Sequence, residues 1–163
     1  MHKSLSVIGN VIPQHYFFMG NITIFHLAIP ITNILLAKQF YHEGLGCSVG
    51  RENKSAIIFD FYGTQLVGHL THQIPTKQNG IYPRHSGLIL PTKSDWQKIC
   101  ARAQKKSLTF EEQPKLRFPL QDVEHYSFFL EDPFFNLLEF KYYSNPEVIF
   151  GGHKSNLIGD TES

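Results

Sequence analysis

Cysteine and charged residues are scarce in this sequence of 163 residues. The two cysteines, Cys47 and Cys100, are too few for a disulfide framework and too far apart for a zinc knuckle. Such usage is typical of a reducing compartment, so we expect a cytoplasmic protein. Charged residues make up 18% of the chain and the formal net charge is +1, which gives no electrostatic basis for binding nucleic acid.

Long apolar runs are also missing. No stretch approaches the roughly 18 apolar residues of a membrane span, so no membrane partner is expected. Residues 1–18 do not resemble a secretory signal, because Asn10, Pro13 and Gln14 interrupt the apolar region. The length suits one well-cored domain. We expect a peripheral tail over residues 1–20, a single domain over 21–146, and a C-terminal tail over 147–163.

Aromatic residues, by contrast, are plentiful, with 14 Phe and 7 Tyr, as expected for a sheet-rich core. The same order of elements is predicted twice: a strand, a helix, then two or three strands. The modules span about residues 22–73 and 84–144, and a loop rich in polar residues and proline separates them. Because one βαβββ module leaves an apolar sheet face open, two should pair around a cavity. The prediction is an α+β fold of paired βαβββ modules forming a half-open barrel.

Capping residues mark the two predicted helices. The first follows Asn33 as N-cap and ends at the glycines 44 and 46. The second begins at Ser94, with Gln97 at the capping-box position. Strands are predicted over residues 22–30, 55–62, 65–72, 84–91, 124–130 and 137–143, and a loop over 114–119.

One carboxylate and three histidines each lie alone on an apolar strand. Glu139 is part of the last strand, where burial of its charge is costly without a cation or a hydrogen-bond network. The three histidines are His26, His69 and His85. If the modules pair, these four side chains converge, which predicts a metal site. A simpler interpretation also exists: histidines can hydrogen-bond to backbone in a core, and Lys141 or Arg84 can neutralise Glu139.

Four segments together resemble the vicinal oxygen chelate superfamily. They are residues 25–30 (FHLAIP), 40–47 (FYHEGLGC), 84–89 (RHSGLI) and 132–139 (DPFFNLLE). The superfamily includes glyoxalase I, the fosfomycin and bleomycin resistance proteins and the type I extradiol dioxygenases. The resemblance covers about residues 24–143 and implies the paired-module fold. It does not specify the reaction, because the superfamily runs many reactions on one scaffold.

The resemblance implies a divalent metal ion held by His26, His85 and Glu139. Two histidines and one carboxylate are typical of non-haem Fe(II) sites, which we favour, although Zn, Ni and Mn suit the same donors. His69 falls at or beside the fourth family position, as a ligand or as a catalytic acid/base. Gln65, Asp60 and Lys141 are expected to contact the substrate. The ligands can come from one chain or from two, and a homodimer fits because relatives often share sites across a two-fold axis.

The favoured function is an enzyme resembling extradiol dioxygenases, acting on a small molecule that chelates the metal through vicinal oxygens. One alternative is a glyoxalase- or isomerase-like metalloenzyme, in which His69 or Glu139 moves a proton. Another is a non-catalytic ligand-binding protein of the bleomycin-resistance type. Two positions depart from the family pattern: Phe135 replaces a turn glycine, and Phe129 replaces the tyrosine of extradiol enzymes.

Overall fold

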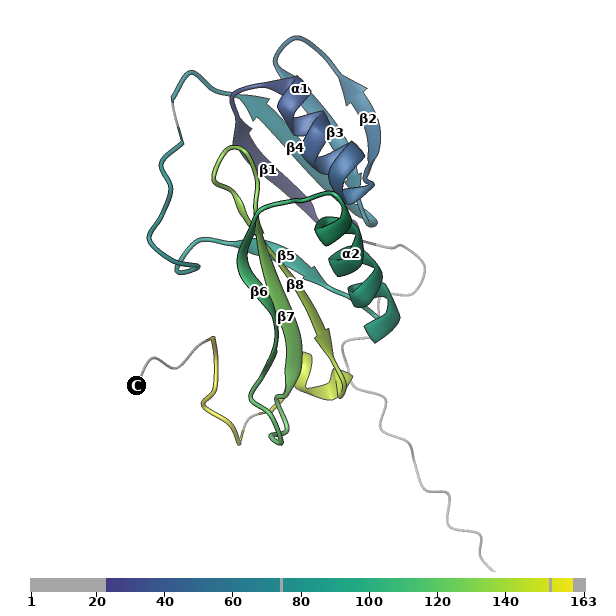
Figure 1. The fold of residues 1–163 in the computed structure, drawn as a ribbon, viewed down its shortest axis with the longest axis vertical. Coiled ribbons are helices and arrows are strands. Elements are labelled where there is room, and N and C mark those ends of the chain that lie inside the picture. The colour runs from purple at the N-terminus through teal and green to yellow at the C-terminus, as the bar shows by residue number, and fades with distance from the viewer. Residues whose placement is uncertain (1–22, 74, 153, 160–163) are drawn as a thin grey trace, which may run out of the picture.

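Two four-stranded mixed sheets form the chain, which the computed structural model describes over residues 23–73, 75–152 and 154–159 (Figure 1). In each sheet the first and last strands of one module pair in parallel, and the other pairs are antiparallel. The sheet orders are β1-β4-β3-β2 and β5-β8-β7-β6. The strands are β1 (His26–Ile31), β2 (Ser48–Glu52), β3 (Ala56–Phe61), β4 (Thr64–Leu70), β5 (Ser86–Ile89), β6 (Phe110–Arg117), β7 (His125–Glu131) and β8 (Leu137–Tyr143).

The predicted α+β class and the two βαβββ modules are confirmed. The tail predicted over residues 1–20, and residue 22 of the strand predicted over 22–30, lie outside the described residues; residues 23–25 are described but are not part of the strand, which begins at His26. None of the helices in the described part of the chain is long and apolar enough to cross a membrane.

The helices begin and end at capping residues. In the first module, α1 (Ile34–Ala37) continues into the π-helical η2 (Lys38–Leu45); the Asn33 side chain accepts a hydrogen bond from Leu36 N. Gly46 ends this helix with a φ of 89°, a conformation that favours glycine. In the second module, α2 (Lys93–Lys105) is capped by Thr92, which accepts from Asp95 N. The predicted cap at Ser94 is therefore wrong, because a threonine two residues earlier supplies the acceptor.

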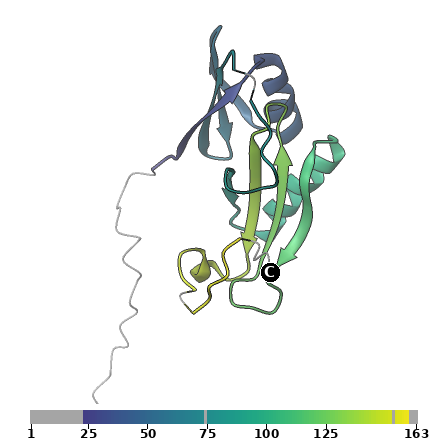
Figure 2. The ribbon, with the colours of Figure 1, turned by 90° about the vertical axis from the view of Figure 1, so that its left-hand side faces the viewer.

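The helices of the two modules lie on one side of the sheets and join them into one body (Figures 1 and 2). Arg102 on α2 donates to the carbonyl of Gly44 at 2.7 Å and to that of Glu43 at 3.1 Å. A single apolar core includes Leu66 of the first sheet and Phe140 of the second. Among the described residues, no helix lies against the other face of the first sheet, and the other face of the second sheet meets the short C-terminal segment that includes Val148 and Ile149, so within one chain the sheets stay open.

Two strands were not predicted. β2 is short and mostly exposed, so it lacks an apolar alternation. β6 runs through Pro114, where a loop was expected, because β6 is an edge strand and its pairing with β7 has register shifts. Proline is tolerated at such positions since no neighbouring strand needs its missing N–H.

The turn before β8 fixes the register of the last strand. Phe135 has a φ of 63°, so it takes the left-handed conformation that the family's glycine would adopt. The buried Asp132 carboxylate holds the turn by accepting from Phe134 N and Asn136 N, at 2.8 Å each. It also accepts from Tyr41 Oη at 2.7 Å, which ties the turn to η2.

Candidate metal-binding site

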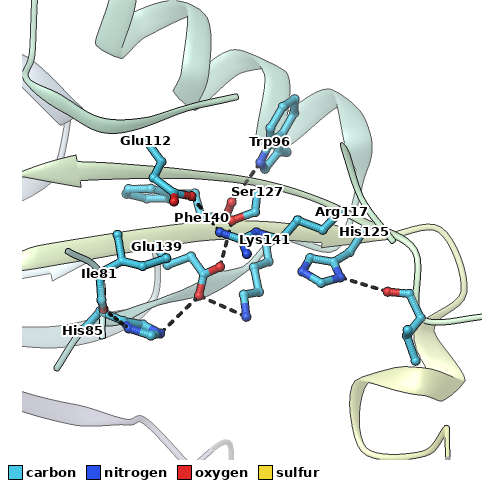
Figure 3. Close-up of polar contacts among 11 residues, drawn as sticks. Ile81, His85, Trp96, Glu112, Arg117, His125, Ser127, Glu139, Phe140 and Lys141 are labelled. Atoms are coloured by element: carbon cyan, nitrogen blue, oxygen red, sulfur yellow. Dashed lines mark hydrogen bonds and ion pairs between the residues drawn. The ribbon is translucent and has the colours of Figure 1, made fainter. Parts of the chain in front are cut away.

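Polar side chains gather on the open face of the second sheet (Figure 3). Along β8, Glu139 and Lys141 point to this face, while Leu138 and Phe140 enter the core. In the neighbouring strand β7, Ser127 pairs with Lys141 in register. The same alternation puts the apolar Phe129 and Leu137 on this face, where they pack with Ile81, so the polar group lies beside a small apolar cluster.

Glu139 is 5% exposed and lies at the centre of this group. Ser127 Oγ donates to its Oε1 at 2.8 Å, whereas His85 Nε2 and Lys141 Nζ approach its Oε2 at 3.3 and 3.0 Å. Burial alone would raise the pKa of Glu139, but the hydrogen bond from His85, the charge of Lys141 and the bond from Ser127 together lower it to about 2. Glu139 is thus an ionised, preoriented carboxylate.

The backbone orients His85 toward Glu139. His85 Nδ1 lies 2.9 Å from the carbonyl oxygen of Ile81, which can only accept, so Nδ1 carries a hydrogen. In a neutral ring the lone pair of Nε2 then faces the Glu139 carboxylate. Two acceptors at this distance require a proton or a cation between them. Without metal it is a proton, and the hydrogen bond to Glu139 raises the pKa of His85.

His26 has the same arrangement on the first sheet. It pairs with Gln65 in register, and its Nδ1 lies 2.8 Å from Gln65 Oε1. With that oxygen as acceptor, Nδ1 carries the hydrogen and the lone pair of Nε2 is available. Histidines that ligate metals usually donate their other N–H to such an acceptor. His26 with Gln65, and His85 with Glu139, are called the first and second half-sites below.

One chain does not bring the two half-sites together. Among the described residues, no three side chains of the histidine, cysteine or carboxylate type form a group that could hold a metal ion. His69 is also remote from His26: it is exposed, pairs with Pro30, and lies four residues beyond Gln65, or about 13 Å along β4. The structure therefore separates His69 from the site that the sequence predicted for it.

The two other residues expected to contact substrate differ in position. Asp60 is exposed and pairs with Gln65, but its Oδ1 accepts a hydrogen bond from Gly63 N at 2.7 Å, which holds the β3–β4 turn. Lys141 lies beside Glu139. Lys141 is thus better placed than Asp60 to meet a ligand at the second half-site.

A cavity of about 530 Å³ adjoins Glu139 on the same face. Sequence reasoning did not predict several of its residues. The segment predicted as a C-terminal tail lines one side, and it includes η3 (Pro146–Ile149). Arg117 and His125, both 5% exposed, line another side. Alternation along β7 puts His125 and Ser127 on the same face of the sheet. That this is the face of Glu139 and Lys141 follows from the pairing of Ser127 with Lys141.

The ion pair of the second half-site predicts how stability depends on pH in the metal-free protein. Because the pKa of Glu139 is about 2, below its ordinary 4.5, its contribution is present above 4.5 and is lost as the pH falls toward 2. The raised pKa of His85 has the opposite sign: its contribution is present below 6.5 and is lost as the pH rises through the raised value. We expect Glu139→Gln to remove the acid-side loss, measured by urea unfolding with chelator across this range. A difference between the two proteins that does not change with pH would contradict this expectation.

Comparison with known proteins identifies the family. Residues 23–140 match the model of the Glyoxalase/Bleomycin resistance protein/Dioxygenase superfamily. A protein of this description from Alicyclobacillus acidocaldarius is 37% identical, with a TM-score of 0.74, and the match covers 78% of this chain and 96% of that one. Lactoylglutathione lyase from Agrobacterium tumefaciens is 16% identical, with a TM-score of 0.57 and coverage of 74% and 92%, so it shares the fold. No curated protein matches the chain.

These likenesses agree with the geometry. The match to the superfamily spans both modules and ends within β8, just past Glu139. It therefore includes both half-sites, the π-helical η2 and the Asp132 turn. Module order, strand pairing and sequence agree over most of the chain: it belongs to the glyoxalase/bleomycin resistance protein/dioxygenase superfamily.

Proposed function

We propose that the protein is a metal-dependent enzyme in which His26, His85 and Glu139 hold a divalent ion. The observation that carries this proposal is the matched state of the two histidines. Each Nδ1–H is taken by an acceptor of the protein, so Nε2 is the nitrogen that can ligate a metal, and His85 Nε2 already faces the third donor, Glu139. Two imidazoles and one carboxylate leave coordination positions open for substrate, and they suit Fe(II) best.

The site would be assembled from two chains. The first half-site of one chain would face the second half-site of its partner, so that a two-fold dimer holds two sites. The open sheet faces support this arrangement, because His26 is exposed on a face without a helix against it. Each sheet would then cover the open face of the other chain's sheet.

A bound ion would act as a Lewis acid and polarise two vicinal oxygens of a small substrate. The protein's own residues would set the geometry. Gln65 and the Ile81 carbonyl orient the two imidazoles, and Ser127 holds the carboxylate oxygen of Glu139 that faces away from His85. Because Glu139 is already ionised, the proton that an arriving ion would displace is the one on His85 Nε2.

His125 would take the proton-transfer role first assigned to His69. Its Nδ1 lies 2.9 Å from the Val123 carbonyl oxygen, so Nδ1 carries the hydrogen and Nε2 can accept a proton. Burial lowers the pKa of His125, which keeps the ring neutral near pH 7. Its ring lines the cavity beside Glu139. A neutral base at this position could accept a hydroxyl proton as a substrate binds the ion.

The reaction we favour is dioxygenase-like, because the three-donor set leaves positions for both a chelating substrate and O₂. A glyoxalase- or isomerase-like reaction is the second candidate. Gln65 favours it, since its amide oxygen could turn from His26 to become a fourth ligand. Oxygen uptake during turnover separates the two reactions: only the first consumes O₂.

The test is the metal content of protein purified without oxygen. We expect about one ion per chain in the wild type, and loss of the ion in His85→Ala and Glu139→Ala, because two remaining donors bind weakly. His69→Ala is the matched control and should retain the ion, since His69 lies at the far end of β4. Wild-type protein that stays metal-free after divalent ions are added back would refute the enzyme and leave a ligand-binding protein.

A further inference from the structure

We infer that Lys141 changes partner when the metal binds: it leaves Glu139 and holds an anionic group of the substrate in the adjoining cavity. This inference rests on the proposed function. It goes further by naming the substrate class, a small planar acid with vicinal oxygens at one end and an anionic group at the other.

The first step is competition for one oxygen atom. Lys141 Nζ lies 3.0 Å from Glu139 Oε2, and His85 Nε2 approaches the same atom at 3.3 Å (Figure 3). An ion bound between His85 and Glu139 would place two positive charges beside the ammonium group. Lysine has a flexible stem and no fixed fork geometry, so it can move away at low cost.

The second step is the destination of the lysine. The cavity of about 530 Å³ has the size of a small-molecule site, and Lys141 lines it. Arg117 also lines it, but Arg117 already contacts Glu112 at 2.7 Å, and Glu112 is not part of the lining. Once Glu139 ligates the ion, Lys141 loses its anionic partner. An anionic ligand in the cavity would replace that partner.

The third step is spacing. Lys141 follows Glu139 by two residues on the same face, so the two side chains leave the strand about 7 Å apart. A substrate that chelates the ion held by Glu139 could therefore reach Lys141 with an anionic group about one ring width from its chelating oxygens. Beyond Lys141, the rings of His125 and Tyr143 stack at 4.5 Å with an angle of 28°, and both residues line the cavity. Aromatic rings in the lining favour a planar, aromatic acid as the ligand.

The experiment compares two probes that differ in charge at one end. 3,4-Dihydroxybenzoate and 3,4-dihydroxybenzamide share the ring and the vicinal hydroxyls, and only the first carries a carboxylate. With Zn(II)-loaded protein, whose ion has no redox chemistry and so cannot support oxidation of the probes, we expect calorimetry to show at least about tenfold tighter binding of the benzoate. Lys141→Met should remove this preference without weakening the benzamide, and Lys141→Arg should keep part of it.

A second readout needs no ligand. Lys141→Met should bind Zn(II) several-fold more tightly than the wild type, because the competing ammonium is gone. Lys115→Met is the matched control: this lysine lies on β6, bridges to Glu112 and does not line the cavity, so neither quantity should change.

The outcomes separate the two proposals. Equal binding of the two probes to the Zn(II)-loaded wild type would overturn the role of Lys141 and leave the metal site standing. Tighter binding of the benzoate than of the benzamide by Lys141→Met would also overturn the role of Lys141 and leave the metal site standing. Failure of the wild type to bind Zn(II) would refute the proposed function itself.

Discussion

Chains with His26→Ala and chains with Glu139→Ala are each expected to lose metal binding and to regain part of it when mixed. In the proposed dimer, a mixed pair joins an intact His26 from one chain to intact His85 and Glu139 from the other. Random mixing makes about half of the dimers mixed, and each mixed dimer has one complete site of two. Metal analysis after coexpression should therefore give about a quarter of the wild-type content.

The matched control uses two changes in the same half-site. His85→Ala and Glu139→Ala remove neighbouring ligands of the second sheet. Every site in their mixed dimers then lacks one of these two ligands, so no recovery is expected. Absence of recovery in the first pair as well, with dimers intact, would show that the ligands do not come from two chains.

The fold could be predicted from the sequence to the extent that local patterns decide it. Alternation along Leu137–Tyr143 predicted that Glu139 and Phe140 point to different faces of the sheet. The structure confirms this, with Phe140 in the core and Glu139 on the open face. The N-cap at Asn33 and the stop at Gly46 depend on single residues, and both are confirmed. β6 was missed because the tolerance of Pro114 depends on its position at the sheet edge, which only the tertiary structure determines.

The candidate site was harder to predict because it depends on register. Parallel pairing places Gln65 opposite His26 and moves His69 opposite Pro30, and no local pattern reveals which residue of β4 meets His26. The proximity of His85 and Glu139 was anticipated through the family motifs. The second half-site also includes the Ile81 carbonyl, which lies in a loop, and Ser127, which lies on a neighbouring strand. The sequence does not show how close these two groups lie to His85 and Glu139.

Gly87→Ala is expected to disrupt the second half-site although it removes no ligand. Gly87 pairs with Glu139 in register, and a Cβ at position 87 would overlap the backbone carbonyl oxygen of Glu139. Backbone cannot swing aside as a side chain does, so β5 would have to separate from β8. We expect a loss of at least about 3 kcal/mol in the free energy of unfolding, measured with urea and chelator.

The same movement should carry His85 away from Glu139, because His85 immediately precedes β5. Zn(II) affinity should fall at least about tenfold even at temperatures where the variant is fully folded. Gly50→Ala is the matched control, also a strand glycine, whose added Cβ would lie 3.4 Å from the nearest atom, the Ile58 carbonyl oxygen, an ordinary contact. It should change stability by less than about 1 kcal/mol and leave metal affinity unchanged. A folded Gly87→Ala protein with wild-type Zn(II) affinity would mean that the β5–β8 pairing does not position His85, and the second half-site would lose its structural basis.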